Sequence, residues 1–410
     1  MSVDTVSGES LRAAMVDHLV ADHAAKGLIM RPEVEAALRA VPRHLFTPDA
    51  ALEDAYQDRA LVTKRLGDEA ISSVSAPWLI AEMLGQAADA TGGMAGRHVL
   101  EIGSGGYNAA LLRELTGPSG SVTTVDIDPD VTGRATACLA AAGYGDVTVV
   151  CADAERPVGS GRSYDLIIVT AGAWDIPPAW TGQLSGEGTL VVPLRTFGMT
   201  RSWALRRLGD VLVSHSQRLC GFVPVQGAGA RKMRYVDVAE GVHLRLDEDQ
   251  ETDLEAVGEL LSRPPALAWA GVSLPPRTVL ADLDLWLAVR ITAAGQQFVL
   301  LTAQQEAVDA GVVAPGWRFG TPAVLHHGTF CYRSALRWTD GRFDLGARAH
   351  GSEAAAAAER MAGDMRAWLD AGSPQPVLHV LPAGTPDGDL PAGTVLDRRH
   401  SRVVLTFTPA

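Results

Sequence analysis

Short apolar runs, separated by segments of helical composition, occupy residues 97–200 of the chain. The runs are His98–Ile102, Ser121–Ile127, Val147–Cys151, Asp165–Thr170 and Thr189–Pro193. They lie roughly 18–25 residues apart, a spacing typical of strand–helix–strand units whose parallel strands are buried on both faces. The segments Ala109–Leu115 and Val131–Ala142 have the composition of the connecting helices. The pattern predicts a doubly wound, Rossmann-like α/β domain.

Helices are predicted ahead of this domain. Ser10 is placed to cap a first helix, which Gly27 can end. Pro32 suits the first turn of a second helix. An irregular stretch is expected up to about Ala76, and a third helix from Pro77.

Beyond about residue 200 the pattern becomes that of an α+β region. Strands are predicted at 203–208, 211–217, 221–225, 285–290, 297–302, 323–328, 343–349, 377–381 and 401–407. One helix is expected between Ser352 and Gly372, because Met361, Met365 and Trp368 recur at helical spacing. A glycine-rich segment at 227–231 is a candidate boundary between the two regions.

The charge balance limits the classes of partner. The 410 residues carry 35 Lys and Arg against 48 Asp and Glu, a formal net charge of −13, which argues against binding of nucleic acid by bulk electrostatics. No uncharged apolar stretch approaches the roughly 18 residues of a membrane-spanning helix. The first ten residues do not resemble a secretory signal. A cytoplasmic protein without membrane contact is expected.

The cysteines give no sign of a metal site. Cys138, Cys151, Cys220 and Cys331 form no ligand spacing with one another or with the histidines. The adjacent pair His326–His327 is a poor candidate, because neighbours on a strand point to opposite faces. We expect reduced, structural thiols and no metal.

The most informative segment is the glycine-containing turn at residues 103–106, which follows a buried strand and precedes a helix. Its spacing is not the dinucleotide pattern G-x-G-x-x-G, because Asn108 stands where the third glycine belongs. It is not a phosphate-binding P-loop either, since no Gly-Lys-Ser/Thr follows. The turn predicts close approach of a ligand to the backbone.

Acids stand at the ends of the neighbouring strands. Asp126 ends the second strand, where its carboxylate can accept both hydroxyls of a ribose, and Asp153 follows the third strand. Together with Glu101 and the glycine turn, these acids indicate a nucleoside ligand that has no phosphate. S-adenosylmethionine fits that description.

With these residues in place, the chain from residue 1 to about 225 resembles the protein-L-isoaspartate O-methyltransferase family. The matching motifs are VPRHLF at 41–46, AYQD at 55–58, SVSAP at 73–77, VLEIGSGGYNAALL at 99–112, YDLIIVTAGA at 164–173 and IPPAWTGQLSGEGTLVVP at 176–193. They occur in the order of the family and cover about half the chain. The resemblance implies a class I methyltransferase domain that binds S-adenosylmethionine and releases S-adenosylhomocysteine.

The resemblance also implies roles for individual residues. The cofactor would be bound by Ser73, Glu101, Gly103, Ser104, Gly105, Asn108, Asp126, Ile127, Asp153 and Ala154. Ser75 matches the serine beside the transferred methyl group and the acceptor carboxylate, and capping of the following helix is its alternative role. Val74, Lys64 and Arg65 are candidate substrate contacts, although basic loop residues are commonly just solvated.

Three departures distinguish the chain from the compact repair enzymes of the family. The glycine loop reads G-S-G-G-Y, one residue shorter than usual, the turn before SVSAP is KRLGDE, and a long C-terminal region is added. In these features the chain resembles an extended actinobacterial branch associated with ribosomally made lanthipeptides, lasso peptides and graspetides. That resemblance implies methylation of an aspartate carboxylate in a modified peptide, giving an ester that can cyclise to aspartimide.

Other functions remain open. General repair of isoaspartyl residues in proteins is the main alternative. Methylation of nucleic-acid bases is disfavoured, because Thr170-Ala171-Gly172-Ala173 stands where an Asn/Asp-Pro-Pro-aromatic tetrad is needed. A non-enzymatic cofactor-binding scaffold is the last possibility. Transfer to a carboxylate needs no strong base, since a carboxylate is ionised at neutral pH, and the sequence contains no convincing catalytic dyad.

Three segments are therefore expected. Residues 1–80 form the N-terminal helices and the substrate loop, and residues 81–228 form the cofactor-binding α/β domain. Residues 229–410 form a C-terminal α+β extension that recognises the peptide substrate. The oligomeric state is not predicted.

Overall fold

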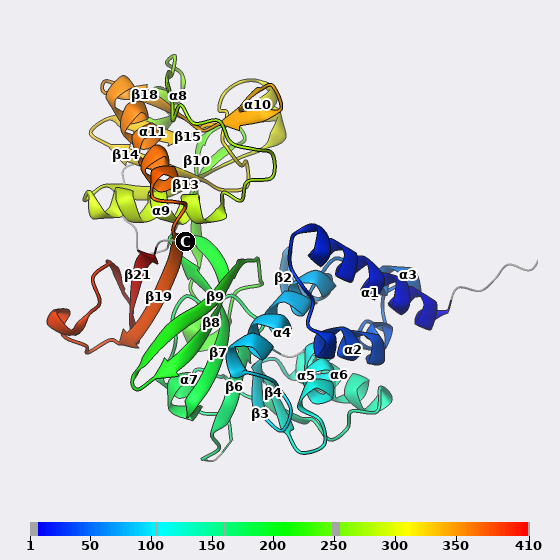
Figure 1. Cartoon of the computed structure of the whole chain (residues 1–410). Helices are drawn as coiled ribbons and strands as arrows, with labels where there is room; N and C mark the ends of the chain where they lie inside the picture. Colours follow the sequence, from blue (N-terminus) through cyan, green and yellow to red (C-terminus); the bar gives the residue numbers. More distant parts are fainter. Residues whose placement is uncertain (1–6, 104, 160, 248–254, 409–410) are drawn as a thin grey trace, which may run out of the picture.

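The computed structural model describes residues 7–103, 105–159, 161–247 and 255–408 of the chain. Two large sheets organise them. One is a ten-stranded mixed sheet and the other is a seven-stranded antiparallel sheet. In Figure 1 the seven-stranded sheet lies above the ten-stranded one, and the N-terminal helices lie to one side.

The five predicted strands form the parallel half of the ten-stranded sheet. They are β3 (His98–Ile102), β4 (Ser121–Asp126), β5 (Thr148–Cys151), β6 (Tyr164–Val169) and β7 (Leu184–Thr196). Their order is β7-β6-β3-β4-β5. The connections run in opposite directions from β3, so the carboxyl ends of β3 and β6 flank the position where doubly wound sheets bind ligands.

The central strands of this half are buried on both faces, whereas the edge strand β5 is partly exposed. Leu166 and Ile168 of β6 belong to the core cluster that includes the N-terminal helices, whereas Ile167 and Val169 belong to a second cluster on the other face of the sheet, which also includes Trp180. The side chains of a strand alternate between faces, so a strand covered on both sides consists of apolar residues throughout. This explains why these strands were recognisable in the sequence.

The N-terminal half contains the expected helices, together with three short helical elements that the sequence did not predict. They are α1 (Gly8–Ala25), α2 (Pro32–Ala40), η1 (Arg43–Phe46), α3 (Leu52–Ala55), α4 (Pro77–Thr91), α5 (Tyr107–Thr116), α6 (Pro129–Ala141) and α7 (Pro178–Gln183). The predicted cap of the first helix is wrong by three residues. The Ser7 hydroxyl accepts from the Ser10 amide at 3.1 Å, so the helix starts earlier.

A hairpin replaces part of the irregular stretch expected before Ala76. Strands β1 (Leu61–Leu66) and β2 (Glu69–Val74) pair antiparallel as a two-stranded sheet. Most side chains of β1 are at least partly exposed, and a strand without a buried face has no apolar alternation to reveal it. The hairpin leads directly into the turn before α4.

Antiparallel strands extend the main sheet beyond β7. They are β8 (Met199–Leu208), β9 (Val211–Leu219), β19 (Gln375–Pro382), β20 (Thr394–Asp397) and β21 (Ser401–Thr408), in the order β7-β8-β9-β19-β21-β20. The end of the chain thus returns to the sheet of the N-terminal half, with His379 paired to Val213. That residues 229–410 form a separate C-terminal extension stays a prediction. The structure adds that the strands within 375–408 belong to the ten-stranded sheet.

The seven-stranded sheet has the order β10-β11-β13-β14-β15-β18-β12. Its strands are β10 (Met233–Ala239), β11 (Val242–Asp247), β12 (Ala266–Trp269), β13 (Gln297–Ala303), β14 (Thr321–His326), β15 (Thr329–Arg333) and β18 (Gly346–Gly351). The C-terminal half also contains a small hairpin, β16 (Arg337–Thr339) and β17 (Arg342–Asp344). Its helices are α8 (Glu255–Leu261), α9 (Ala281–Ala293), α10 (Gln305–Asp309) and α11 (Ala354–Asp370), and its short turns are η2 (Gly227–Gly229) and η3 (Asp387–Asp389).

Two predicted strands are wrong. Residues 285–290 lie inside α9, which contacts α11 and β14 as well as β19 and β20 and therefore buries Leu283, Leu285 and Leu287 together. A short apolar run cannot distinguish a strand from a helix buried on several sides. Residues 221–225 form only an isolated bridge between Pro224 and Gly172. Within the described residues, none of the helices combines the length and apolar character that a membrane crossing requires.

Candidate active site

Two adjoining hollows lie at the carboxyl ends of β3, β4, β5 and β6. The larger has a volume of about 720 Å³ and the smaller about 390 Å³. Both are lined by Ser73, Gly103, Gly105 and Thr170, so they form one continuous groove.

The groove brings together the predicted cofactor residues that the structure describes. The larger hollow is lined by Ser73, Gly103, Gly105, Asp126, Ile127, Asp153 and Ala154, and the smaller by Glu101, Asn108, Val74 and Ser75 among others. Ser104 lies outside the described residues. Lys64 and Arg65 line neither hollow.

The glycine turn has a backbone that only glycine adopts easily. Gly103 has φ +98°, and a Cβ atom there would lie 2.7 Å from the Thr170 hydroxyl. Gly106, with φ +81°, precedes α5, and a Cβ atom there would crowd the Phe46 ring. The Thr170 amide donates to the Ile102 carbonyl at 2.8 Å, which holds the ends of β3 and β6 together. The turn therefore keeps the floor of the groove open to a ligand.

Glu101, the acid within β3, is fully buried. Its carboxylate accepts hydrogen bonds from the Thr124 hydroxyl at 2.5 Å and from the side-chain amide of Asn108 at 2.9 Å. Burial raises the pKa of Glu101 to about 7, although these two hydrogen bonds oppose the shift. The side chain is thus poised to change its charge near neutral pH, directly beside the groove.

This raised pKa predicts a pH dependence of stability. Because the folded state holds the Glu101 proton more tightly than the unfolded chain, the associated stability is full below about pH 4.5 and is lost as the pH rises through 7. The total is about 3 kcal/mol, from roughly 1.4 kcal/mol for each unit of pKa shift. Urea unfolding of the cofactor-free protein from about pH 5 to pH 8 measures it.

The control for this prediction is Glu101→Gln, which keeps a side chain of the same shape without a titrating group. The difference in unfolding free energy between the original chain and the variant should fall steadily with rising pH. A difference that stays constant over this range would show that Glu101 does not titrate there.

The two acids at the ends of β4 and β5 also organise the backbone. One carboxylate oxygen of Asp126 accepts from the Asp128 amide at 2.9 Å. Asp153 accepts from the Glu155 amide at 2.9 Å and from the Ala228 amide at 3.1 Å. Both side chains are held by short turns and line the larger hollow, so each is fixed in place before a ligand arrives.

Ser75 lies in the turn between β2 and α4. The helix begins at Pro77 with Ala76 as its N-cap residue, and no side chain caps it. The capping role considered for Ser75 is therefore wrong. The Ser75 hydroxyl forms no hydrogen bond with another residue in the described part of the chain. Ser75 lines the smaller hollow together with Tyr107 and Phe222. Its hydroxyl is placed to serve a ligand in that hollow.

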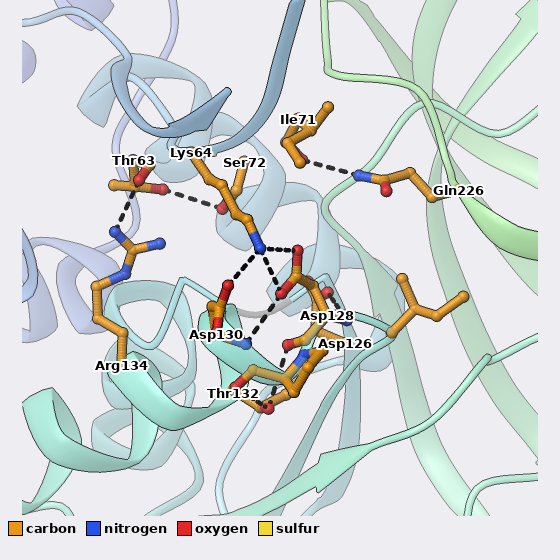
Figure 2. A network of polar contacts seen from close by, with 12 residues as sticks. Thr63, Lys64, Ile71, Ser72, Asp126, Asp128, Asp130, Thr132, Arg134 and Gln226 are labelled. Carbon is orange, nitrogen blue, oxygen red and sulfur yellow. Dashed lines mark hydrogen bonds and ion pairs between the residues drawn. The ribbon is translucent and has the colours of Figure 1, made fainter. Parts of the chain in front are cut away.

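Lys64 fastens the hairpin to the start of α6, as Figure 2 shows. Its ammonium group donates to both carboxylate oxygens of Asp128, at 2.8 and 2.6 Å, and to Asp130 at 2.7 Å. The ammonium also holds the pKa of Asp128 below its usual range. Arg65 donates to the Asp68 carbonyl within the hairpin turn. Binding of substrate by these two residues stays a prediction, and the contacts favour a structural role for Lys64.

We expect Lys64→Met to loosen the β1–β2 hairpin without unfolding the protein. The variant leaves Asp128 and Asp130 without the cation that joins them to β1, so backbone amides of the hairpin should exchange several-fold faster with solvent. Hydrogen exchange read by mass spectrometry checks this. Lys26→Met, which removes an exposed pair within α1, is the matched control. Unchanged exchange in the hairpin would contradict the role of Lys64.

Part of the groove was not anticipated from the sequence. The segment at 222–226 lines both hollows, and the Gln226 side chain donates to the Ile71 carbonyl of the hairpin at 3.1 Å. Trp180 donates from its indole to the Ala154 carbonyl at 2.9 Å. No local pattern indicates these contacts, because 222–225 is an apolar run followed by a single Gln226, and the segment reaches the groove only through the fold.

Comparisons with known proteins agree with this geometry. Residues 14–230 match the model of the family described as protein-L-isoaspartate(D-aspartate) O-methyltransferase (PCMT). A protein-L-isoaspartate O-methyltransferase of Ignicoccus hospitalis is 40% identical over 177 residues, which are 43% of this chain and 80% of the relative. Protein-L-isoaspartate O-methyltransferase 2 of Archaeoglobus fulgidus is 34% identical over 221 residues, 53% of this chain and 95% of the relative.

Solved structures are similar at lower identity. A putative protein-L-isoaspartate O-methyltransferase from Plasmodium falciparum, solved in complex with S-adenosyl-L-homocysteine, is 14% identical with a TM-score of 0.44. The similarity covers 51% of this chain and 97% of that one. Since the family model spans more than half of the chain, the chain belongs to the protein-L-isoaspartate(D-aspartate) O-methyltransferase family and is an S-adenosylmethionine-dependent protein carboxyl O-methyltransferase.

Proposed function

We propose that the chain esterifies the side-chain carboxylate of an aspartyl-type residue, which binds at Ser75 in the smaller hollow. The observation that carries this proposal is the Ser75 hydroxyl, which caps no helix and lines a hollow continuous with the carboxylate-lined groove. A carboxylate acceptor can take one directional hydrogen bond from such a hydroxyl.

The residues of the groove fit S-adenosylmethionine, and we assign them as follows. The Asp126 carboxylate accepts from the ribose hydroxyls, with Ile127 beside it, and Asp153 with Ala154 contacts the adenine. The amino-acid and ribose end of the cofactor is assigned to Glu101, Gly103 and Gly105, with Ser73 and Asn108 as further cofactor contacts. Ser104, which lies outside the described residues, is assigned to the same end from the sequence. The absence of phosphate-binding features and the two acids at strand ends support a nucleoside without phosphate.

The chemistry asks little of the protein beyond orientation and exclusion of water. The cofactor, when bound, supplies a methyl group on a sulfonium. The acceptor carboxylate is already ionised, so Ser75 has to hold its direction and no base has to remove a proton. Ile80, Met83 and Phe222 form an apolar side of the hollow that excludes water. Orientation of this kind can supply roughly 7–11 kcal/mol of barrier reduction.

For the acceptor, we propose an ordinary aspartate in a ribosomally made, modified peptide, whose ester can cyclise to aspartimide. The KRLGDE turn and the C-terminal region with its own seven-stranded sheet support a dedicated substrate. Recognition of that peptide by residues 229–410 is part of the proposal. General repair of isoaspartyl residues is the second candidate, supported by the relatives that carry this activity in their names.

Methyl incorporation read by mass spectrometry tests the proposal. The protein and S-adenosylmethionine are incubated with an isoaspartyl peptide and with its aspartyl twin. Labelling of the isoaspartyl peptide alone would establish the repair activity and overturn the proposal that the enzyme acts on a dedicated peptide. No labelling of either, with cofactor binding demonstrated by calorimetry, is the result expected for an enzyme that requires a particular modified peptide.

Ser75→Ala is compared with the original chain on a peptide that the original chain methylates. Loss of one hydrogen bond to a charged acceptor should lower methyl transfer by about tenfold or more, whereas cofactor affinity should not change. Transfer at the original rate would place the acceptor elsewhere.

A further inference from the structure

Arg43, in the short helix η1, is a cation with no exposed surface. Its Nε donates to the Ala55 carbonyl at 2.8 Å, and one terminal nitrogen donates to the carbonyls of Arg59 and Val74 at 3.2 and 3.4 Å. The other terminal nitrogen, Nη1, is buried without a hydrogen-bond partner. Within the described residues no carboxylate forms an ion pair with this guanidinium.

Arg43 lies directly behind the wall of the smaller hollow. The carbonyl of Val74 that it contacts belongs to the residue before Ser75, and the ring of Tyr107 lies 5.1 Å from the centre of the guanidinium. Val74 and Tyr107 both line the hollow together with Ser75. The Tyr107 hydroxyl is likewise buried without a partner. Arg43 therefore contacts two residues that line the hollow.

Among the described residues, Asp58 attracts Arg43 without forming an ion pair with it. The titratable groups around it and around the hollow are Arg12, Tyr56, Asp58, Glu101 and Tyr107. Asp58 accepts from the Trp78 backbone amide at 2.9 Å, and Glu101 already accepts two hydrogen bonds. A buried cation without a paired anion is costly and uncommon, so it calls for a physical reason.

We propose that Arg43 is a positioning residue whose guanidinium, which forms no ion pair within the described residues and lies behind Val74 and Tyr107, draws the acceptor carboxylate to Ser75. The inference rests on the proposed function, since it requires the acceptor to bind in this hollow. The positive potential compensates the carboxylate for the water that it loses on entering the site. Because Arg43 does not reach the carboxylate itself, it adds attraction without a second hydrogen bond that would reduce nucleophilicity.

A thiol introduced by Ser75→Cys reports this potential without any acceptor or methyl transfer. The pKa of this thiol is measured from the pH dependence of alkylation by iodoacetamide, with peptides resolved by mass spectrometry. Exposed Cys151 serves as the internal reference, Cys138 and Cys331 are buried, and the partly exposed Cys220 is resolved on its own peptide. We expect a thiol pKa below the ordinary value of about 8.5, and an increase of at least roughly one pH unit when Arg43→Met is added.

Two further variants separate charge from packing. Arg43→Lys retains the cation but not the planar set of donors, so the thiol pKa should stay low even if the melting temperature falls. Arg59→Met removes a half-exposed arginine that is paired with Asp54, and it should leave the thiol pKa unchanged. If the thiol pKa is the same with and without the Arg43→Met replacement, the proposal is overturned, whatever the outcome of the peptide methylation assay.

Discussion

Asp126→Ala is expected to weaken binding of S-adenosylmethionine by about a hundredfold or more. The carboxylate at the end of β4 is assigned to two ribose hydroxyls, and each hydrogen bond to a charged group contributes about 1.5–3 kcal/mol. The variant also removes the acceptor that holds the Asp128 amide. Titration calorimetry with S-adenosylmethionine and with S-adenosylhomocysteine measures the loss.

Asp126→Asn is the matched control for this prediction. It retains an oxygen that can accept from the Asp128 amide and from one hydroxyl, so the loss of affinity should be smaller than with alanine. Thermal unfolding of both cofactor-free variants checks that the fold persists. If the alanine variant binds the cofactor as tightly as the original chain, the ribose is not at Asp126.

The second large effect concerns stability, at an ion pair between α9 and β15. Arg333 Nε donates to Asp284 Oδ1 at 2.7 Å and Nη2 donates to Oδ2 at 3.1 Å, in a two-pronged geometry. Only 3% of Arg333 and 9% of Asp284 are exposed. Asp284→Ala would leave the guanidinium buried without its anion, which is expected to lower the free energy of unfolding by about 3–5 kcal/mol.

Chemical denaturation followed by tryptophan fluorescence measures this loss. The double replacement Asp284→Leu with Arg333→Met should recover most of it, because an apolar pair of similar volume removes both buried charges together. Glu259→Ala breaks an exposed ion pair with Arg263 at the C-terminal end of α8. It should change the free energy of unfolding little. A small effect of Asp284→Ala would mean that water reaches Arg333.

The parallel half of the main sheet could be predicted because burial on both faces leaves a clear trace in the sequence. Residues such as Leu166, Ile167 and Ile168 form one apolar run, and the turns between such runs carry glycine and acids. The hairpin β1–β2 leaves no such trace, since its residues are largely exposed. The helix α9 was predicted as a strand because its buried face is wider than an amphipathic stripe.

The candidate site was predictable for a related reason. Parallel strands end at the same edge, so Glu101, Asp126 and Asp153 had to gather once the strand order was assumed. The contacts of 222–226 and of Lys64 depend on the folded path of the chain over this edge. A basic residue in a loop does not reveal whether it faces solvent, substrate or, as for Lys64, two carboxylates more than sixty positions away.

The pairing of β19 with β9 has a consequence for biosynthesis. Residue 213 leaves the ribosome long before residue 379, its partner in the sheet, so β9 presents an open edge while about 160 residues are being translated. The nascent chain is most exposed to aggregation during that interval, and a message cut short before codon 375 would yield a polypeptide that cannot close this edge. Fast translation of this stretch, or a chaperone acting over it, should therefore raise the yield of folded enzyme.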